Sequence, residues 1–541
     1  MERTDTYSVN ITGVAENQNF YYAKMVKARK QRLHPDLSSS FVTLSPVQLT
    51  RCKPNLADAP TPGAVHGNRL ASRVLVNSGQ SKCEAYIASG NRVHVVSIAI
   101  NKDAGIESGK EGVLIPSPPI VSDASTFFQS RFPAEIQSLS LHHSSSSPQG
   151  YMDASSHLAM IDCYGRAHVM QLPANDVEQD CTSTALSAPA GLGSLEGSWA
   201  GIQLSSSSST SSPALGGTAA GDMTAVTAMR FGKAAAVYRL GELADSSAGV
   251  VPLRVFHTLG YPSSLTWTRN LSGSPDSVFA LAEDSRVTLF DIRQGERGGL
   301  MQQLSPAPTG EPFYSLSWLT LPSTHSFSKP SLADASQGLL VSAGGDRAVV
   351  VMEPRKWHTV HKWQAPVKYA IHHLAFSHVN PSYCYVSGMD YECMCGRWDG
   401  GESTGGPGSA TAVASGNSNS ATGAGHGRAV GPKGMPGIGP TSASIAHAAG
   451  CEGPTAGSEG PDEKADVVAK AHPAARKPGS LGFSFRSDSR FLGMHCCVDT
   501  SRSMGLGASS SELLTSYSQT GHIFALQVKS SLFTGCLAES S

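Results

Sequence analysis

Short apolar stretches that alternate with polar, glycine-containing turns recur along most of the chain. In residues 84–100, EAYIASGNRVHVVSIAI, two such stretches flank Gly90-Asn91. Residues 277–293, SVFALAEDSRVTLFDIR, and residues 338–353, GLLVSAGGDRAVVVME, have the same form. Apolar and polar residues that alternate with a period of two are typical of β-strands, and glycine with polar residues between two strands is typical of a tight turn. The pattern therefore predicts β-hairpins along the chain.

About seven copies of this unit follow one another at spacings of roughly 30–60 residues. The copies cover residues 72–100, 134–172, 199–259, 263–293, 313–353, 368–399 and, in two pieces, 481–496 with 511–528. Repetition at this scale predicts an all-β fold, a single β-propeller of about seven four-stranded blades. A single blade cannot bury both faces of its sheet, so each blade packs against its two neighbours in the ring. The run AVVVME at residues 348–353 fits a strand with both faces covered, near the centre of the ring.

Low-complexity segments interrupt these repeats at residues 144–150, 205–221 and 400–480. The last has no Phe, Trp or Tyr, so burial cannot offset its ordering entropy, and we expect a disordered loop between the sixth and seventh blades. The organisation that follows is one domain with long loops. It comprises a basic arm at 1–40, six blades with a ring-closing strand at 41–399, the loop at 400–480, the last blade at 481–528 and a tail at 529–541.

Composition limits the class of partner and the compartment. The chain has 541 residues, with 41 Lys and Arg against 42 Asp and Glu, so no global field favours nucleic acid or an anionic membrane. Its 11 cysteines lack the spacing of a secreted disulfide scaffold, and no apolar run is long enough to cross a membrane. We therefore expect a protein of the cytoplasm, the nucleus or both, without membrane contact.

Sequence motifs for catalysis and metal binding are weak. The phosphate-binding pattern GxxxxGK[ST] does not occur, and the single GxSxG match, Gly401–Gly405, lies in the low-complexity segment. Cys384, Cys393 and Cys395 are close in sequence, but without paired C-x-x-C spacing they are more typical of buried thiols than of a zinc site. We expect no catalysis, no cofactor and no metal. The alternative is an enzyme with its active site at the mouth of the ring.

The N-terminal arm contains one candidate binding segment. Residues Phe20–Leu33 have a helix-forming composition, and Lys24, Lys27 and Lys30 would lie along one basic side. The pattern predicts a docking helix, a nuclear-import signal or a nucleic-acid contact. A solvated arm is the alternative, because a short helix is marginally stable alone.

A second basic segment, rich in aromatic residues, contains Arg355, Lys356, Trp357 and Trp363. We interpret it as a connection between the fifth and sixth blades. Trp and Arg side chains of this kind suit a protein-binding rim. The alternatives are tryptophans packed between blades and, less favoured, a nucleic-acid contact through stacking and phosphate binding.

The repeats resemble the WD-repeat family of β-propellers. The best match, VSGMDYECMCGRWD, has Asp390 in its turn and ends in Trp398-Asp399. Two weaker copies have Asp284 and Asp346 in the same place. The resemblance implies that each turn aspartate is hydrogen-bonded within its blade and that the tryptophan packs between blades.

The same resemblance implies how the ring closes. Family members pair an N-terminal strand with the C-terminal blade, and Phe41–Leu49 is the candidate strand in this chain. Pro46 would confine it to an edge or a bulge.

A propeller presents loops on two rims, which predicts a non-catalytic scaffold for protein–protein interactions, present as a monomeric subunit of a hetero-complex. Val278–Arg293 also resembles the box of propellers that serve cullin-RING ubiquitin ligases through the damage-binding adaptor. Asp284, Asp291 and Arg293 match its key positions, and Asp346, Glu353 and Arg355 repeat the spacing in the next blade. By this resemblance Arg293 and Arg355 would face the adaptor, and the protein would be a substrate receptor. A third hypothesis is a subunit of a nuclear RNA or chromatin assembly, bound through the basic arm.

Overall fold

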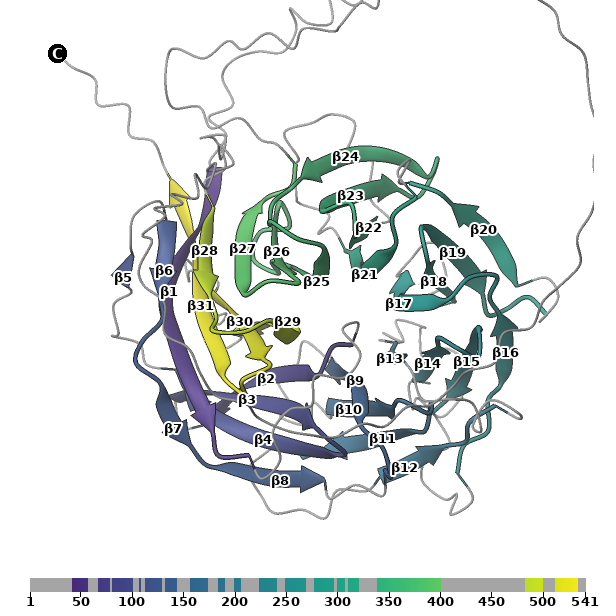
Figure 1. Cartoon of the computed structure of the whole chain (residues 1–541), viewed down its shortest axis with the longest axis horizontal. Coiled ribbons are helices and arrows are strands. Elements are labelled where there is room, and N and C mark those ends of the chain that lie inside the picture. The colour runs from purple at the N-terminus through teal and green to yellow at the C-terminus, as the bar shows by residue number, and fades with distance from the viewer. Residues whose placement is uncertain are drawn as a thin grey trace, which may run out of the picture. The chain divides into compact units, whose positions relative to one another are not determined.

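Seven β-sheets arranged in a ring form the described part of the chain, in a computed structural model (Figure 1). It describes residues 41–56, 67–77, 80–100, 107–108, 112–128, 132–143, 156–173, 183–189, 199–205, 223–240, 249–268, 277–295, 299–306, 310–320, 338–399, 482–499 and 511–533. All its regular elements are β-strands. The expected all-β propeller of seven four-stranded blades is confirmed.

Each blade has four strands, and the first of them is the innermost. Blade one is β2 (Leu70–Asn77), β3 (Gln80–Ser89), β4 (Arg92–Ala99) and β8 (Ala124–Phe128); blade two is β9 (Ile136–His143), β10 (Ser156–Asp162), β11 (Ala167–Leu172) and β12 (Ser183–Leu186); blade three is β13 (Ala200–Leu204), β14 (Thr224–Met229), β15 (Ala234–Arg239) and β16 (Arg254–His257); blade four is β17 (Pro262–Thr268), β18 (Val278–Glu283), β19 (Arg286–Asp291) and β20 (Leu300–Leu304).

The remaining three blades repeat this plan. Blade five is β21 (Phe313–Leu319), β22 (Leu339–Gly344), β23 (Ala348–Glu353) and β24 (His358–Gln364); blade six is β25 (Ile371–Phe376), β26 (Tyr383–Gly388), β27 (Glu392–Arg397) and β28 (Phe483–Arg486); blade seven is β29 (Phe491–Asp499), β30 (Ser511–Ser518), β31 (Ile523–Phe533) and β1 (Phe41–Pro54). The first strand of every blade contacts the first strands of both neighbours, so these seven strands line the centre of the ring (Figure 1).

The hydrophobic core lies between blades, because alternate residues of one strand face opposite neighbours. In β23, Val349 and Val351 pack in a cluster with blade six, whereas Val350 and Met352 pack in a cluster with blade four. Every residue of β23 is buried, as the apolar run 348–353 predicts. Its expected place near the ring centre is wrong, since β23 is the third strand outward and β21 is the innermost.

The N-terminal strand closes the ring. β1 pairs antiparallel with β31, from Phe41 opposite Phe533 to Cys52 opposite Ile523, which is the arrangement expected for Phe41–Leu49. The register shifts between Pro46 and Gln48, because proline cannot donate to the ladder. Both strands are longer than the sequence pattern indicates: β1 reaches Pro54, and β31 continues to Phe533 beyond the expected end at 528.

A belt from blade one reinforces this closure, and the sequence carries no sign of it. Between β4 and β8 the chain forms β5 (Glu107–Ser108), β6 (Val113–Ile115) and β7 (Ile120–Ser122) along the outer edge (Figure 1). β6 pairs parallel with β28 of blade six, and β7 pairs parallel with β1 of blade seven. The belt therefore covers the outer edge of blade six and the outer edge of blade seven, the blade in which the N-terminal strand closes the ring.

The boundary between the last two blades differs from the expected one. Phe483–Arg486 pairs with β27, so it is the fourth strand of blade six and not the start of the last blade. The insertion at 400–480 therefore interrupts blade six and does not separate blades six and seven. A fourth strand needs only a free sheet edge, so it can follow a long insertion without a change in topology.

Candidate partner-binding surfaces

Two faces of the ring differ in the connections that they carry. Because strands alternate in direction, the turns between second and third strands and the connections from one blade to the next lie on one face, which we call the hairpin face. The connections between first and second and between third and fourth strands lie on the other, which we call the insertion face. The long insertions at 206–222, 321–337 and 400–481 all leave the ring at the insertion face.

Arg293 lies on the insertion face, directly after β19. Its Nε is 3.0 Å from Asp291 Oδ1 and its Nη2 is 2.8 Å from Asp291 Oδ2. The Arg293 backbone N–H also donates to Asp291 Oδ1 at 2.9 Å. These hydrogen bonds lower the pKa of Asp291, although burial opposes them, and they raise the pKa of Arg293. The Arg293 side chain is 50% exposed, so a buried carboxylate fixes a solvent-facing guanidinium.

Arg355 repeats this arrangement in blade five. Its Nε is 3.2 Å from Glu353 Oε1, which also accepts the Arg355 backbone N–H at 3.2 Å. The arginine side chain is again 50% exposed above a buried carboxylate. Both arginines follow the third strand of adjacent blades, so they lie on the same face. We call them the paired arginines.

The segment after Arg355 is not a connection between blades, which corrects the sequence interpretation. Lys356 and Trp357 belong to the turn between β23 and β24, and Trp363 lies within β24, the outer strand of blade five. Trp357 has a φ of 52° and packs partly buried against the cluster between blades four and five. Trp363 packs on Gly396 of blade six, where a Cβ would lie 2.7 Å from the indole. Both tryptophans therefore pack against the cores between blades, with part of each side chain exposed.

The turn aspartates lie on the hairpin face. Asp346 Oδ1 accepts the Ala348 N–H at 3.1 Å, and its Oδ2 is 3.1 Å from Lys362 Nζ in the same blade. Asp284, with a φ of 52°, accepts the Tyr261 N–H at 3.4 Å. Burial raises the pKa of Asp390, against a backbone hydrogen bond that lowers it.

Trp398 and Asp399 follow β27 at the insertion face. Trp398 is fully buried in the cluster between blades five and six, and its indole N–H donates to the Pro381 carbonyl at 2.7 Å. Asp399 is buried and accepts two hydrogen bonds from Arg397 at 3.0 and 2.8 Å. Lys24, Lys27 and Lys30 lie outside the described residues.

The central channel contains a polar cavity of about 290 Å³ lined by the innermost strands. Three of its histidines contact neighbouring blades: His373 Nε2 is 3.3 Å from the Phe491 carbonyl, His378 Nε2 is 3.1 Å from the Cys496 carbonyl, and His495 Nδ1 is 3.0 Å from Ser72 Oγ. In the described ranges no three His, Cys, Asp or Glu residues lie close enough together to hold a metal ion.

The clustered cysteines are core residues. Cys393 and Cys395 pack between blades six and seven, whereas Cys384 packs between blades five and six. Burial raises the pKa of all three thiols, which keeps them protonated and poorly reactive.

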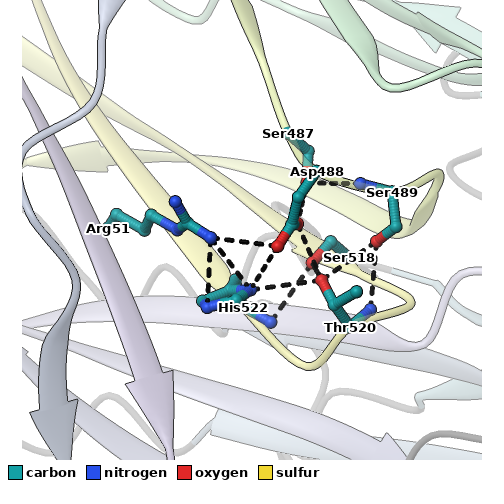
Figure 2. A network of polar contacts seen from close by, with 7 residues as sticks. All are labelled: Arg51, Ser487, Asp488, Ser489, Ser518, Thr520 and His522. Atoms are coloured by element: carbon teal, nitrogen blue, oxygen red, sulfur yellow. Dashed lines mark hydrogen bonds and ion pairs between the residues drawn. The ribbon is translucent and has the colours of Figure 1, made fainter.

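A polar network at the hairpin face of blade seven brings His, Asp and hydroxyl groups together (Figure 2). His522 Nδ1 is 3.2 Å from Asp488 Oδ2 and 3.1 Å from Thr520 Oγ1, and Thr520 Oγ1 donates to Asp488 Oδ1 at 2.7 Å. A catalytic triad needs the carboxylate at one ring nitrogen and the nucleophile at the other. In this network both lie at Nδ1, and Arg51 Nη2 lies 3.2 Å from Nε2. The arrangement therefore joins β1 to the inner strands of blade seven, and its geometry is not that of a catalytic triad.

Exposed apolar side chains gather at the hairpin face, which sequence reasoning missed. They are Tyr164, Phe231, Leu259, Tyr261, Tyr369, Met389 and Tyr391. Each lies in a tight turn or a connection between blades, where an isolated sequence carries no sign of exposure. The Arg166, Lys233 and Lys368 side chains lie over the rings of Tyr164, Tyr261 and Tyr369.

Neither protein-family models nor curated proteins match this chain. Among the described residues, no helix has the length and apolar character needed to span a membrane.

Proposed function

We propose that this seven-bladed propeller is a non-catalytic scaffold of the WD-repeat type that binds other proteins. The observation that carries the proposal is the pair of half-exposed arginines on one face of adjacent blades. A guanidinium held by a buried carboxylate loses little conformational entropy on binding, and its planar array of N–H groups suits a partner's carboxylates or carbonyls. Arginine is also enriched among the residues that dominate protein interfaces.

A more specific role follows from the same pair. Asp291–Arg293 and Glu353–Arg355 have the spacing of the box through which propellers bind the damage-binding adaptor of cullin-RING ligases. The spatial arrangement favours this role, because both arginines lie on the same face and each is oriented by its own carboxylate. We therefore propose a substrate receptor as the second candidate function, with the adaptor as the partner at this face.

Co-purification of the tagged full-length protein with the adaptor tests this proposal. We expect Arg293→Ala combined with Arg355→Ala to reduce adaptor recovery by about tenfold or more, since a central interface arginine contributes about 1–3 kcal/mol. Arg286→Ala is the matched control, because Arg286 is exposed on the opposite face of blade four.

Thermal melting of each variant separates loss of binding from loss of folding. An adaptor signal that persists in the double variant would exclude the paired arginines as its binding site. If the wild type recovers other proteins through these arginines but no adaptor, the scaffold proposal stands and the receptor role fails.

A further inference from the structure

The hairpin face of blades three and four carries a compact apolar patch. Phe231 lies in the turn between β14 and β15, and Leu259 and Tyr261 lie in the connection between β16 and β17. Their exposed fractions are 48%, 70% and 40%. The rings of Phe231 and Tyr261 meet edge to face with centroids 6.4 Å apart. Together with Arg230 and Lys233 these residues form what we call the Tyr261 patch.

Hydrogen bonds hold the patch rigid. The buried carboxylate of Glu283 accepts the backbone N–H groups of Leu259 and Gly260 through Oε2, at 3.0 and 2.8 Å. The Thr258 N–H donates to the Lys233 carbonyl at 2.7 Å, which ties the two loops together. The buried Glu283 carboxylate thus orders the loop in which Leu259, the most exposed apolar side chain of the patch, faces solvent. Such preorganisation lowers the entropic cost of binding.

Positive charge surrounds the patch. Lys233 Nζ lies 4.3 Å from the centroid of the Tyr261 ring, and the Arg230 guanidinium lies 5.7 Å from it. In the part of the chain that the structure describes, neither cation forms an ion pair with a carboxylate. Among the described residues on the hairpin face of blades three to six, exposed and half-exposed cations outnumber exposed and half-exposed carboxylates. The exposed or half-exposed cations are Arg230, Lys233, Arg286, Arg347 and Lys368, against Asp284, Glu311 and Asp390, with the ion pairs Asp346–Lys362 and Glu392–Arg486 balancing.

We propose that the Tyr261 patch binds an acidic segment of a partner protein that also carries an apolar side chain. The two cations attract carboxylates, and Leu259 and Phe231 offer apolar surface beside them. A protein segment is favoured over a single-stranded nucleic acid, because the most exposed residue is aliphatic and cations lie against the Tyr261 ring where a base would stack. The inference rests on the proposed protein-binding function but uses the opposite face from the paired arginines.

Selection from a displayed library of random peptides about twelve residues long, with the full-length protein as bait, tests this inference. We expect the enriched peptides to place Asp or Glu next to Leu, Phe or Trp. Fluorescence anisotropy should give a Kd that rises at least tenfold in Lys233→Glu and in Leu259→Ser. Binding should also weaken as salt is added, because the cations are exposed.

Two matched variants control for surface change alone. Arg239→Glu reverses an exposed charge at the end of β15, on the opposite face of blade three, and Leu300→Ser removes an exposed leucine from the outer strand β20. Both should bind the selected peptides as the wild type does, with unchanged melting temperatures in all four variants.

Several results would overturn the inference. These are enriched peptides without acidic residues, peptides that bind the patch variants normally, tighter patch-dependent binding of a (dT)20 oligonucleotide, or self-association that Leu259→Ser abolishes. If Arg293→Ala weakens peptide binding and the patch variants do not, the patch fails while the proposed function stands.

Discussion

Glu512 joins blades six and seven, and its replacement should be one of the most damaging single changes in the ring. The side chain projects from β30 and is fully buried. Its Oε1 accepts the Tyr385 hydroxyl at 2.6 Å, and its Oε2 accepts the backbone N–H groups of His378 and Val379 at 2.7 and 3.1 Å. All three donors belong to blade six. One carboxylate therefore satisfies a side chain and two backbone groups across the interface between blades.

Glu512→Ala removes the acceptor from all three donors and leaves a cavity. Removing one partner from a buried charged network costs about 3–5 kcal/mol of stability. Each buried donor that is left without an acceptor contributes about 1–3 kcal/mol to this cost. We expect the free energy of unfolding to fall by about that amount. Glu512→Gln keeps the volume and an acceptor oxygen but loses the charge, so we expect a smaller loss of about 1–2 kcal/mol.

Guanidinium chloride unfolding followed by intrinsic fluorescence would give the two midpoints. The expected order is wild type, then Gln, then Ala. A double-mutant cycle with Tyr385→Phe isolates the hydroxyl contact, whose coupling should be about 1–3 kcal/mol. An Ala variant with the wild-type midpoint and slope, or a zero coupling energy, would refute the view that this carboxylate joins the two blades.

Three further predictions concern ring closure, protonation and the thiols. Replacement of residues 107–122 by a Gly-Ser linker should lower the melting temperature by several degrees, because β6 and β7 then no longer cover blades six and seven; an unchanged melting temperature would show that the belt is dispensable. Burial, together with Arg51 and Lys53, lowers the pKa of His522 below 6.5 although Asp488 opposes this. The stability due to neutral His522 is therefore present above pH 6.5 and declines as pH falls through the folded pKa. His522→Gln should therefore reduce the fall in melting temperature between about pH 7 and 5. A wild-type slope in this variant would contradict the prediction. In a thiol-reagent titration at pH 8, Cys384, Cys393 and Cys395 should react only after unfolding, because burial raises their pKa, whereas labelling in the native state would exclude a packed core between these blades.

The β-hairpins were the part of the fold that the sequence pattern predicted. The second and third strands of each blade, such as β18 and β19, are buried on both faces and joined by a short polar turn, so apolar runs and turn residues mark them clearly. In blades two to five the fourth strands are less buried, because their outer edges face solvent. In β24, HTVHKWQ, no residue is buried, and the pattern alone indicated a connection in place of a strand.

The pairing of strands that are distant in the sequence could not be predicted from the local sequence pattern. β6 and β7 are three residues long, and their partners β28 and β1 are remote in the sequence. Prediction of the candidate sites was limited in the same way. Spacing placed Arg293 and Arg355 in equivalent positions, but only the fold shows which face they share. The exposure of Leu259 depends on Glu283, which lies in another strand and orders the loop around it.

We propose that this propeller binds other proteins through fixed surfaces on its two faces. The most direct measurement is quantitative affinity purification of the full-length protein beside two variants, Arg293→Ala with Arg355→Ala, and Lys233→Glu with Leu259→Ser. We predict that each variant keeps the wild-type melting temperature and loses its own reproducible set of co-purified proteins. If both variants recover the wild-type set in full, the account of these surfaces is contradicted.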